Sequence, residues 1–256
     1  MEQVSFVIPV GDEDRFQKNF VSSPLFQDNP FLEIMPQRGF ANASLAFNDA
    51  IERASHDLII FSHEDVVLPR NWLSVFCNAL SMINVPDIGV VGCWGITANG
   101  QYAGHVFTHH DRELSANRSL PAEVETLDEL LISFRKSSGL RFDCALPGFL
   151  CYSVDICVES SARGLLNFAI DAPCFHNAKG RYRFINQPQY YQGLKYIRKK
   201  WRRRLPIRTA SGTIRRYSAY PYLRAKEILY AFLKIKIIPY WHYLPVINPD
   251  EKLKGS

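Results

Sequence analysis

The feature that most constrains the fold is a short apolar stretch, Leu58 to Ser62, followed directly by His63, Glu64 and Asp65. Five mostly apolar, partly β-branched residues predict a strand that is buried on both faces, as in a parallel sheet. Open α/β sheets bind ligands at the carboxyl ends of their strands, where the imidazole and the two carboxylates would lie. Carboxylates at such a place can hold Mg²⁺ or Mn²⁺ against substrate phosphates. A solvated turn without a ligand is the alternative interpretation.

The segments around this stretch alternate between strand and helix patterns. Strands are predicted at 4–10, 31–35, 88–93 and 168–170 and within 124–134, helices at 43–54, 70–83 and 153–164, and a hairpin or a loop over the site at 95–104. Pro36 is expected to end the second strand, Asn42 or Ser44 to cap the first of these helices, Ser153 to cap the last, and Gly164 to stop it. This order with short links predicts an α/β fold with a parallel sheet and helices on its faces.

Charge divides the chain into two parts. Residues 1–171 carry 11 Lys and Arg against 22 Asp and Glu, a net charge of −11, and residues 172–256 carry 19 against 3, a net charge of +16. Seven of these cations lie in 195–204, interleaved with aromatic and aliphatic residues. Such a region predicts an anionic partner: a membrane surface, a nucleic acid or a phosphorylated substrate. A basic helix folded over the acidic part of the chain is the alternative.

Two further patterns bear on location and metals. The aromatic and aliphatic run 228–241 contains Lys234 and Lys236, so it is too short and too charged to span a bilayer, but it could lie on one. The six cysteines form no Cys-x-x-Cys pair and the amino terminus lacks a signal-peptide pattern, so we expect reduced thiols, no zinc site and a cytoplasmic protein. His105, His109 and His110 are close in sequence, but their spacing fits neither strand nor helix ligation well.

Taken together, these stretches resemble the bacterial glycosyltransferases of the GT-A fold, close to glycosyltransferase family 2 and to its glycosyltransferase-like relatives with a His-x-Asp-Val motif. The resemblance covers about residues 4–178 and rests on the order and spacing of several short stretches. These are Phe6–Val10, Ala41–Ala54, Asp57–Phe61, His63–Val66, Ile88–Gly92, Leu127-Asp128, Arg141–Asp143 and Tyr152–Cys157. It implies a GT-A domain over 1–178, with a Rossmann-like, mostly parallel sheet flanked by helices. The basic, aromatic and helical extension over 179–256 would serve membrane association or acceptor binding.

The resemblance also implies roles for single residues. Asp65 matches the carboxylate that holds Mn²⁺ or Mg²⁺ against the diphosphate of the donor, and His176 matches a histidine that ligates the metal in some relatives. Asp155 matches the general base on the acceptor-side helix, and Asp128 a substrate-side aspartate. The positions expected to bind the nucleotide-sugar are Pro9, Val10, Asp12, Asn42, Ser44, Asn48, His63 and Glu64.

Several positions depart from the family pattern. His63 stands where family 2 more often has an aspartate, which bears on the affinity for the metal ion. Ser153 replaces an acidic residue and Leu150 replaces a frequent histidine, and both bear on how the acceptor is bound. Met35-Pro36-Gln37 stands where a uracil-contacting aspartate is usual, so UDP is expected only as the commonest donor nucleotide.

These expectations combine into one leading hypothesis with two alternatives. The leading hypothesis is an inverting, metal-assisted, hexosyltransferase-type glycosyltransferase that extends a surface polysaccharide, lipopolysaccharide or glycolipid at the inner face of the cell membrane. The first alternative is a non-catalytic GT-A-like binding module, favoured by the replacements at His63 and Ser153. The second is a nucleic-acid-binding protein, favoured only by the basic tail, because no nucleic-acid fold signature accompanies it.

Overall fold

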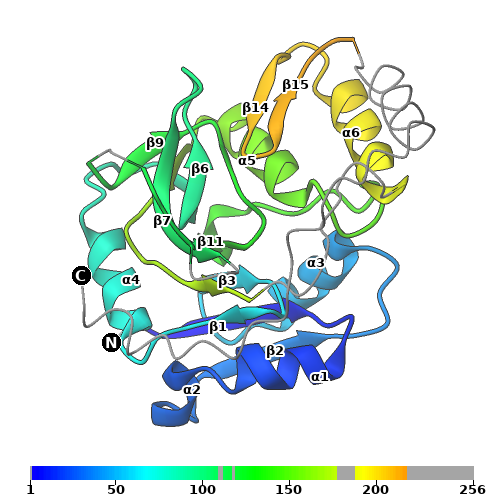
Figure 1. Ribbon diagram of the computed structural model, residues 1–256. Coiled ribbons are helices and arrows are strands. Elements are labelled where there is room, and N and C mark those ends of the chain that lie inside the picture. Colours follow the sequence, from blue (N-terminus) through cyan, green and yellow to red (C-terminus); the bar gives the residue numbers. More distant parts are fainter. Residues whose placement is uncertain (1, 109–111, 117–118, 178–187, 218–256) are drawn as a thin grey trace, which may run out of the picture.

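The structure is a computed structural model that describes residues 2–108, 112–116, 119–177 and 188–217 (Figure 1). His109, His110 and the aromatic run 228–241 lie outside the described residues.

The core of the molecule is a seven-stranded sheet with the strand order β2-β1-β3-β11-β5-β12-β9. β2, β1, β3, β5 and β12 run in one direction, and β11 and β9 run against them. The predicted α/β fold with a mostly parallel sheet is therefore confirmed. The strands are β1 (Val4–Pro9), β2 (Glu33–Gln37), β3 (Leu58–Ser62), β5 (Ile88–Gly92), β9 (Ala122–Val124), β11 (Leu131–Arg135) and β12 (Leu166–Ala169).

Helices cover both faces of this sheet. They are α1 (Glu13–Phe16), η1 (Gln17–Val21), α2 (Pro24–Asp28), α3 (Ala43–Arg53), α4 (Trp72–Ser81), η3 (Lys136–Ser138) and α5 (Tyr152–Ala162). Val7 of β1 and Phe61 of β3 belong to the hydrophobic cluster that α3 and α5 complete. Phe6 and Ile60, one position earlier on each strand, belong to the cluster formed with α1, η1, α2 and α4. Because successive side chains of a strand point to opposite faces, the continuous apolar run is buried from both sides.

A second, six-stranded sheet lies above the first in Figure 1 and has the order β10-β6-β7-β13-β4, with β8 paired to β7. Its strands are β4 (Val66–Val67), β6 (Trp94–Ile96), β7 (Tyr102–Thr108), β8 (Arg112–Ser115), β10 (Thr126–Leu127) and β13 (Phe175–His176). β6 and β7 form an antiparallel hairpin, which decides between the two structures predicted for 95–104. β4 pairs with β13, so the segment directly after β3 is joined to a segment far along the chain.

Three local predictions about element ends met different outcomes. Asn42 caps α3 as predicted, because its Oδ1 accepts the backbone N–H of Leu45 at 2.8 Å. Pro36 was predicted to end the second strand but lies inside β2, which tolerates a proline because it is an edge strand. Ser153 was predicted to cap the last helix, but α5 begins one residue earlier, and its N-cap is Cys151 with φ 70°. The Ser153 hydroxyl instead donates to the carbonyl of Leu127 at 2.9 Å.

The described part of the C-terminal extension packs onto this domain. It consists of α6 (Pro188–Lys200) and a hairpin of β14 (Ile207–Thr209) and β15 (Gly212–Ile214). Ile197, Ile207 and Ile214 are buried in the same cluster as α5. The extension is thus helical over α6, and the hairpin was not predicted. Among the described residues, no helix is long and apolar enough to cross a membrane.

Candidate active site

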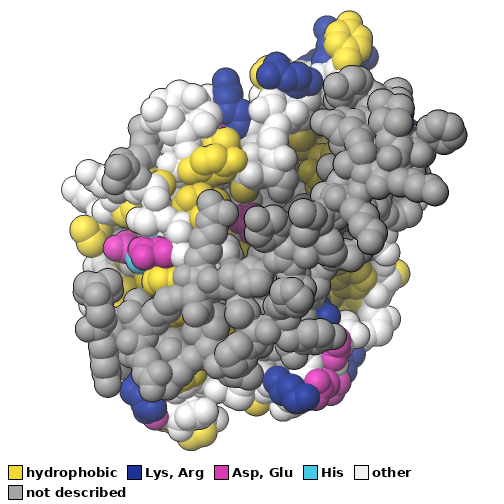
Figure 2. All heavy atoms as spheres, viewed as in Figure 1, with side chains coloured by type: hydrophobic (Ala, Val, Ile, Leu, Met, Phe, Trp, Pro, Cys, Tyr) yellow, Lys and Arg dark blue, Asp and Glu magenta, His cyan; other side chains and the backbone are white. Residues whose placement is uncertain are grey.

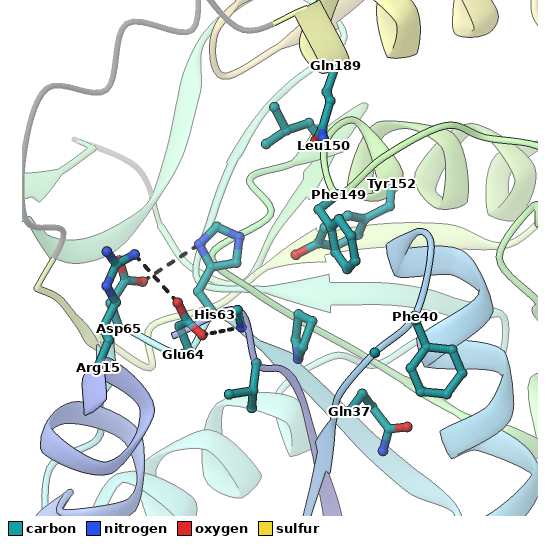
Figure 3. A pocket seen from close by; sticks show the side chains of 14 residues that line it. Arg15, Gln37, Phe40, His63, Glu64, Asp65, Phe149, Leu150, Tyr152 and Gln189 are labelled. Atoms are coloured by element: carbon teal, nitrogen blue, oxygen red, sulfur yellow. Dashed lines mark hydrogen bonds and ion pairs between the residues drawn. The ribbon is translucent and has the colours of Figure 1, made fainter. Parts of the chain in front are cut away.

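A cavity of about 420 Å³ opens at the carboxyl ends of β1, β2 and β3, where the parallel topology predicts a ligand site (Figure 3). His63 points into it, Arg15, Glu64 and Asp65 lie side by side at one end, and Phe149, Leu150 and Gln189 lie toward another (Figure 3). The described residues that line it are Pro9, Val10, Gly11, Arg15, Gln37, Gly39, Phe40, His63, Glu64, Asp65, Phe149, Leu150, Tyr152 and Gln189.

Three side chains at this edge form a group that could hold a metal ion: His63, Asp65 and His176, with ligand atoms within 4.8 Å of one another. Nε2 of His176 lies 3.3 Å from Oδ1 of Asp65, and Nδ1 of His63 lies 3.9 Å from the same oxygen. Within the described part of the chain, that oxygen and Nε2 of His176 are buried without a partner in hydrogen-bond geometry. A buried carboxylate facing two imidazoles is a donor set that fits a divalent transition ion.

Strand pairing brings this group together. The end of β3 is positioned by β11, since the backbone N–H of His63 donates to the carbonyl of Leu130 at 3.1 Å. Val66 then pairs with His176 across β4 and β13, and the N–H of Asn177 donates to the carbonyl of Asp65 at 2.8 Å. The two ladders therefore place His176 beside Asp65 from a separate segment of the chain.

Electrostatics keep the carboxylate charged and one imidazole neutral. Burial alone would raise the pKa of Asp65, but the charges of His176 and His63 outweigh it and hold that pKa well below its usual range. Burial lowers the pKa of His63, whereas for His176 the charge of Asp65 outweighs burial and raises the pKa. A carboxylate and a neutral imidazole are the protonation states in which these groups bind metals.

Glu64 shapes the wall of the cavity. Its Oε2 accepts the backbone N–H groups of Gly11 at 2.7 Å and Asp12 at 3.0 Å, so its carboxylate is bound to the loop between β1 and α1. Val10 of that loop and Pro9 at the end of β1 both belong to the lining. The structure thus brings four of the predicted donor-binding residues together, namely Pro9, Val10, His63 and Glu64.

The other four predicted donor-binding residues do not line the cavity. Oδ1 of Asp12 caps α1 by accepting the N–H of Arg15 at 3.1 Å, and Asn42 caps α3. Asn48 binds the backbone of Phe142 through both atoms of its amide, and Ser44 is buried. Contact of these residues with a donor stays a prediction.

The two predicted catalytic aspartates lie outside the lining as well. Asp155 is 3% exposed, and its carboxylate accepts Nζ of Lys200 at 2.8 Å and Nε1 of Trp201 at 2.6 Å, both contributed by the extension. Burial raises its pKa even though Lys200 opposes the shift. Asp128 accepts the N–H of Leu130 at 3.0 Å, and its charge adds to the raised pKa of His176 and opposes the lowering of the pKa of His63 by burial. Their catalytic roles remain predictions.

The sequence predictions missed several lining residues, among them Arg15, Phe40, Tyr152 and Gln189. Arg15 could have been found, because a basic residue in the first helix after the first strand lies at the carboxyl edge of a parallel sheet. Gln189 belongs to α6, and no local signal in the sequence connects that helix to the cavity.

A half-buried acid next to the start of α5, Glu129, was also missed. Glu129 accepts the backbone N–H of Cys151 through Oε1, whereas its Oε2 is buried without a hydrogen-bond partner among the described residues. Burial raises the pKa of Glu129 to about 8, and the neighbouring charge of Asp128 adds to the effect.

Solved structures of known proteins share the fold of this chain. The chain superposes on the mannosyltransferase PcManGT from Pyrobaculum calidifontis, in complex with GDP-Man and Mn²⁺, with a TM-score of 0.51 and 14% identity over 89% of this chain and 70% of that one. It superposes on the glucosyl-3-phosphoglycerate synthase from Mycobacterium tuberculosis, in complex with Mg²⁺ and uridine diphosphate, with a TM-score of 0.50 and 10% identity over 78% and 79%. Both are GT-A glycosyltransferases. This chain therefore has the GT-A fold, as its resemblance implied.

Comparisons of sequence say less about this chain than the comparison of folds does. No protein-family model matches the chain. One relative, described as "ATP synthase subunits region ORF 6" from Fuscovulum blasticum, is 25% identical over 169 residues, which is 62% of this chain. The match covers 65% of that relative, just under two thirds of its length.

Proposed function

We propose that this protein is a glycosyltransferase that moves a sugar from a nucleotide-diphosphate donor to a hydroxyl group of an acceptor. The observation that carries the proposal is the group of His63, Asp65 and His176 at the edge of the cavity on a GT-A fold. Two GT-A structures of similar fold hold a divalent cation together with GDP-Man or uridine diphosphate.

The residues present fit a metal ion, and their chemistry favours one kind. Two imidazoles and one carboxylate suit a transition ion such as Mn²⁺ better than Mg²⁺, which prefers oxygen ligands throughout. A bound cation would supply electrostatic stabilisation of the charge that develops on the departing diphosphate. Asp65 and the two histidines would hold it, and Glu64 keeps the loop of Pro9 and Val10 in place for the nucleotide.

The acceptor hydroxyl of an inverting reaction must lose a proton to a base. Asp155 is our candidate, with Asp128 assisting on the substrate side. In the present arrangement Lys200 and Trp201 occupy both oxygens of Asp155, so it can take a proton only after α6 shifts. The raised pKa of Asp155 suits a group that has to accept one.

We assign catalysis to residues 1–178 and surface attachment to residues 179–256. Between 188 and 217 the described chain carries ten Lys and Arg and no Asp or Glu. Lys200 and Arg208 pair with acids of the domain, whereas Arg202, Arg203 and Arg204 are exposed. Lys and Arg side chains gather at the top of Figure 2, over the hairpin. We propose that this surface holds the protein on the anionic inner leaflet of a cell membrane, where a surface polysaccharide, lipopolysaccharide or glycolipid is extended.

The test is a thermal-shift panel of UDP-, GDP-, CMP- and dTDP-sugars with Mn²⁺, with Mg²⁺ and without metal. A ligand that binds only the native state raises its apparent stability by mass action. We expect one nucleotide to respond, and to respond more strongly with Mn²⁺ than with Mg²⁺. Silence across the panel would contradict the proposal.

A second candidate function is a GT-A-like binding module without turnover. The observation that favours it is the pairing of Asp155 with Lys200 and Trp201, which leaves no free base on α5 in the position expected for one. A cation-dependent shift in the panel together with no release of the nucleotide from the donor, with any acceptor or with water, would support this module over the enzyme.

A further inference from the structure

One cationic side chain of the cavity has no assigned role. Arg15 lies on α1, and among the described lining residues it is the only Lys or Arg. Its side chain is 30% exposed and lies beside Asp65 and Glu64, facing the same end of the cavity as the candidate metal ligands (Figure 3).

The guanidinium of Arg15 is held loosely. Nη1 lies 3.5 Å from Oε1 of Glu64 and Nη2 lies 3.8 Å from Oδ2 of Asp12, and neither contact has hydrogen-bond geometry among the described residues. Glu64 already accepts two backbone N–H groups, and Oδ1 of Asp12 caps the helix. The five N–H donors of Arg15 are therefore largely left for another anion.

Arg38 shows what an engaged arginine looks like in the same region. Its Nε and Nη2 donate to the two oxygens of Glu13 at 2.8 and 3.0 Å, a bidentate pair typical of an arginine with a structural partner. Arg38 does not line the cavity. The two arginines thus differ in what they bind, although Arg15 is part of α1 and Arg38 binds a residue of α1.

The charges at this end of the cavity leave room for a second cation. The group of His63, Asp65 and His176 contributes one carboxylate and Glu64 adds another at the same end, so a divalent ion held there would leave no net positive charge without Arg15. A nucleotide diphosphate carries more negative charge than that ion can balance. A planar guanidinium matches phosphate oxygens in two-pronged hydrogen bonds.

We infer that Arg15 binds the diphosphate of the nucleotide-sugar donor and acts beside the metal ion as a second cation that balances the charge of the leaving group. This inference rests on the proposed function and adds a diphosphate-binding residue to it. The binding of a nucleoside diphosphate is then expected to depend on Arg15 more strongly than the binding of the corresponding monophosphate.

The experiment measures by calorimetry the affinity for UDP, GDP, dTDP and the corresponding monophosphates, with and without Mn²⁺, of the wild type and of the variants Arg15→Gln, Arg15→Lys and Arg38→Gln. Because charge-assisted hydrogen bonds are lost, we expect Arg15→Gln to weaken diphosphate binding about 10–100-fold and monophosphate binding much less. Arg15→Lys should fall in between, and Arg38→Gln should bind like the wild type. The thermal midpoints of the Arg15 variants without ligand should stay at that of the wild type, because Arg15 makes only long ion pairs.

The failures of the two proposals can be told apart. Wild-type binding of a diphosphate with equal binding by Arg15→Gln would overturn the role of Arg15 and leave the proposed function standing. An equal loss of mono- and diphosphate binding, together with a lowered thermal midpoint, would assign Arg15 to the structure of the loop and overturn the inference as well. No binding of any of these nucleotides by the wild type would overturn both proposals.

Discussion

Glu129 makes the stability of this protein depend on pH in a way that one isosteric substitution should remove. Its carboxyl group is enclosed at the start of α5, with Oε2 buried and unpartnered, and burial raises its pKa to about 8 from an ordinary value of 4.5. The native state then keeps a proton that the unfolded chain has already released, so between these two pH values the native state binds more protons. The free energy of unfolding must fall as pH rises through this window, and it levels off above about pH 8.

The size of this loss of stability follows from the difference between the two pKa values of Glu129. At 1.36 kcal/mol per pH unit, the distance from 4.5 to about 8 corresponds to at most about 5 kcal/mol. The effective dielectric constant near 20 inside a protein makes the cost of burying a charge smaller than this upper limit. We therefore expect the free energy of unfolding to fall by about 2–4 kcal/mol between pH 5 and pH 9. For a chain of 256 residues this corresponds to about 4–8 °C in the thermal midpoint, at about 2 °C per kcal/mol.

Glu129→Gln keeps the shape of the side chain and the acceptor for Cys151 N–H but does not titrate. The assay is denaturant unfolding of both proteins at several pH values from 5 to 9, with circular dichroism as the measure of the folded fraction. We expect the variant to gain stability relative to the wild type by about 2–4 kcal/mol as pH rises, whichever protein is more stable at pH 5. Glu123→Gln, at an exposed position of β9, is the matched control and should show a constant difference. A difference between Glu129→Gln and the wild type that does not change with pH would refute the reasoning.

Three further predictions concern the proposed function. Asp65→Ala should abolish cation-dependent nucleotide binding in calorimetry, because it removes the only carboxylate of the candidate metal group; unchanged affinity would remove the metal assignment. Asp155→Asn should lower turnover by about 10²–10⁴-fold with little effect on donor affinity, because a general base serves the acceptor; an equal loss of donor affinity would move Asp155 to the donor site. Replacement of Arg202, Arg203 and Arg204 by Gln should weaken sedimentation with anionic vesicles about 100-fold at low salt, at about 1 kcal/mol per charge, and less at high salt. Equal binding of the wild type to neutral vesicles, or a preference for competing DNA, would exclude the membrane role.

Local signals were enough for the parallel strands of the central sheet and for the helices α3, α4 and α5. The apolar run before His63 predicted β3 because a strand buried on both faces needs apolar residues at every position. Asn42 predicted the start of α3, since a capping side chain reaches only the next few backbone N–H groups. Gly164, with φ 85°, follows α5 as predicted, because glycine tolerates the left-handed conformation that ends a helix. Each of these signals acts within a few residues and is readable from the chain itself.

The resemblance to the family predicted which positions could bind a metal ion, but not that these residues contact one another. Asp65 and His176 were named separately, and the contact between them depends on β4 pairing with β13. Cross-strand register between distant segments has no local signature, because it is decided by which pairing buries the most apolar surface and satisfies the backbone.

Tertiary structure also decided how the acids are used. Asp155 was predicted as a free base, yet the packing of α6 on α5 brings Lys200 and Trp201 onto both of its oxygens. Glu129 looks like an ordinary surface charge in the sequence, and only the burial of its carboxyl group in the folded chain distinguishes it. The sequence by itself determined the parallel strands of the central sheet, the helices α3, α4 and α5, and the edge of the sheet where polar groups collect. The environment of each charge was decided by segments that meet only in the folded chain, because solvation and Coulomb energy depend on distance in space and not on distance along the sequence.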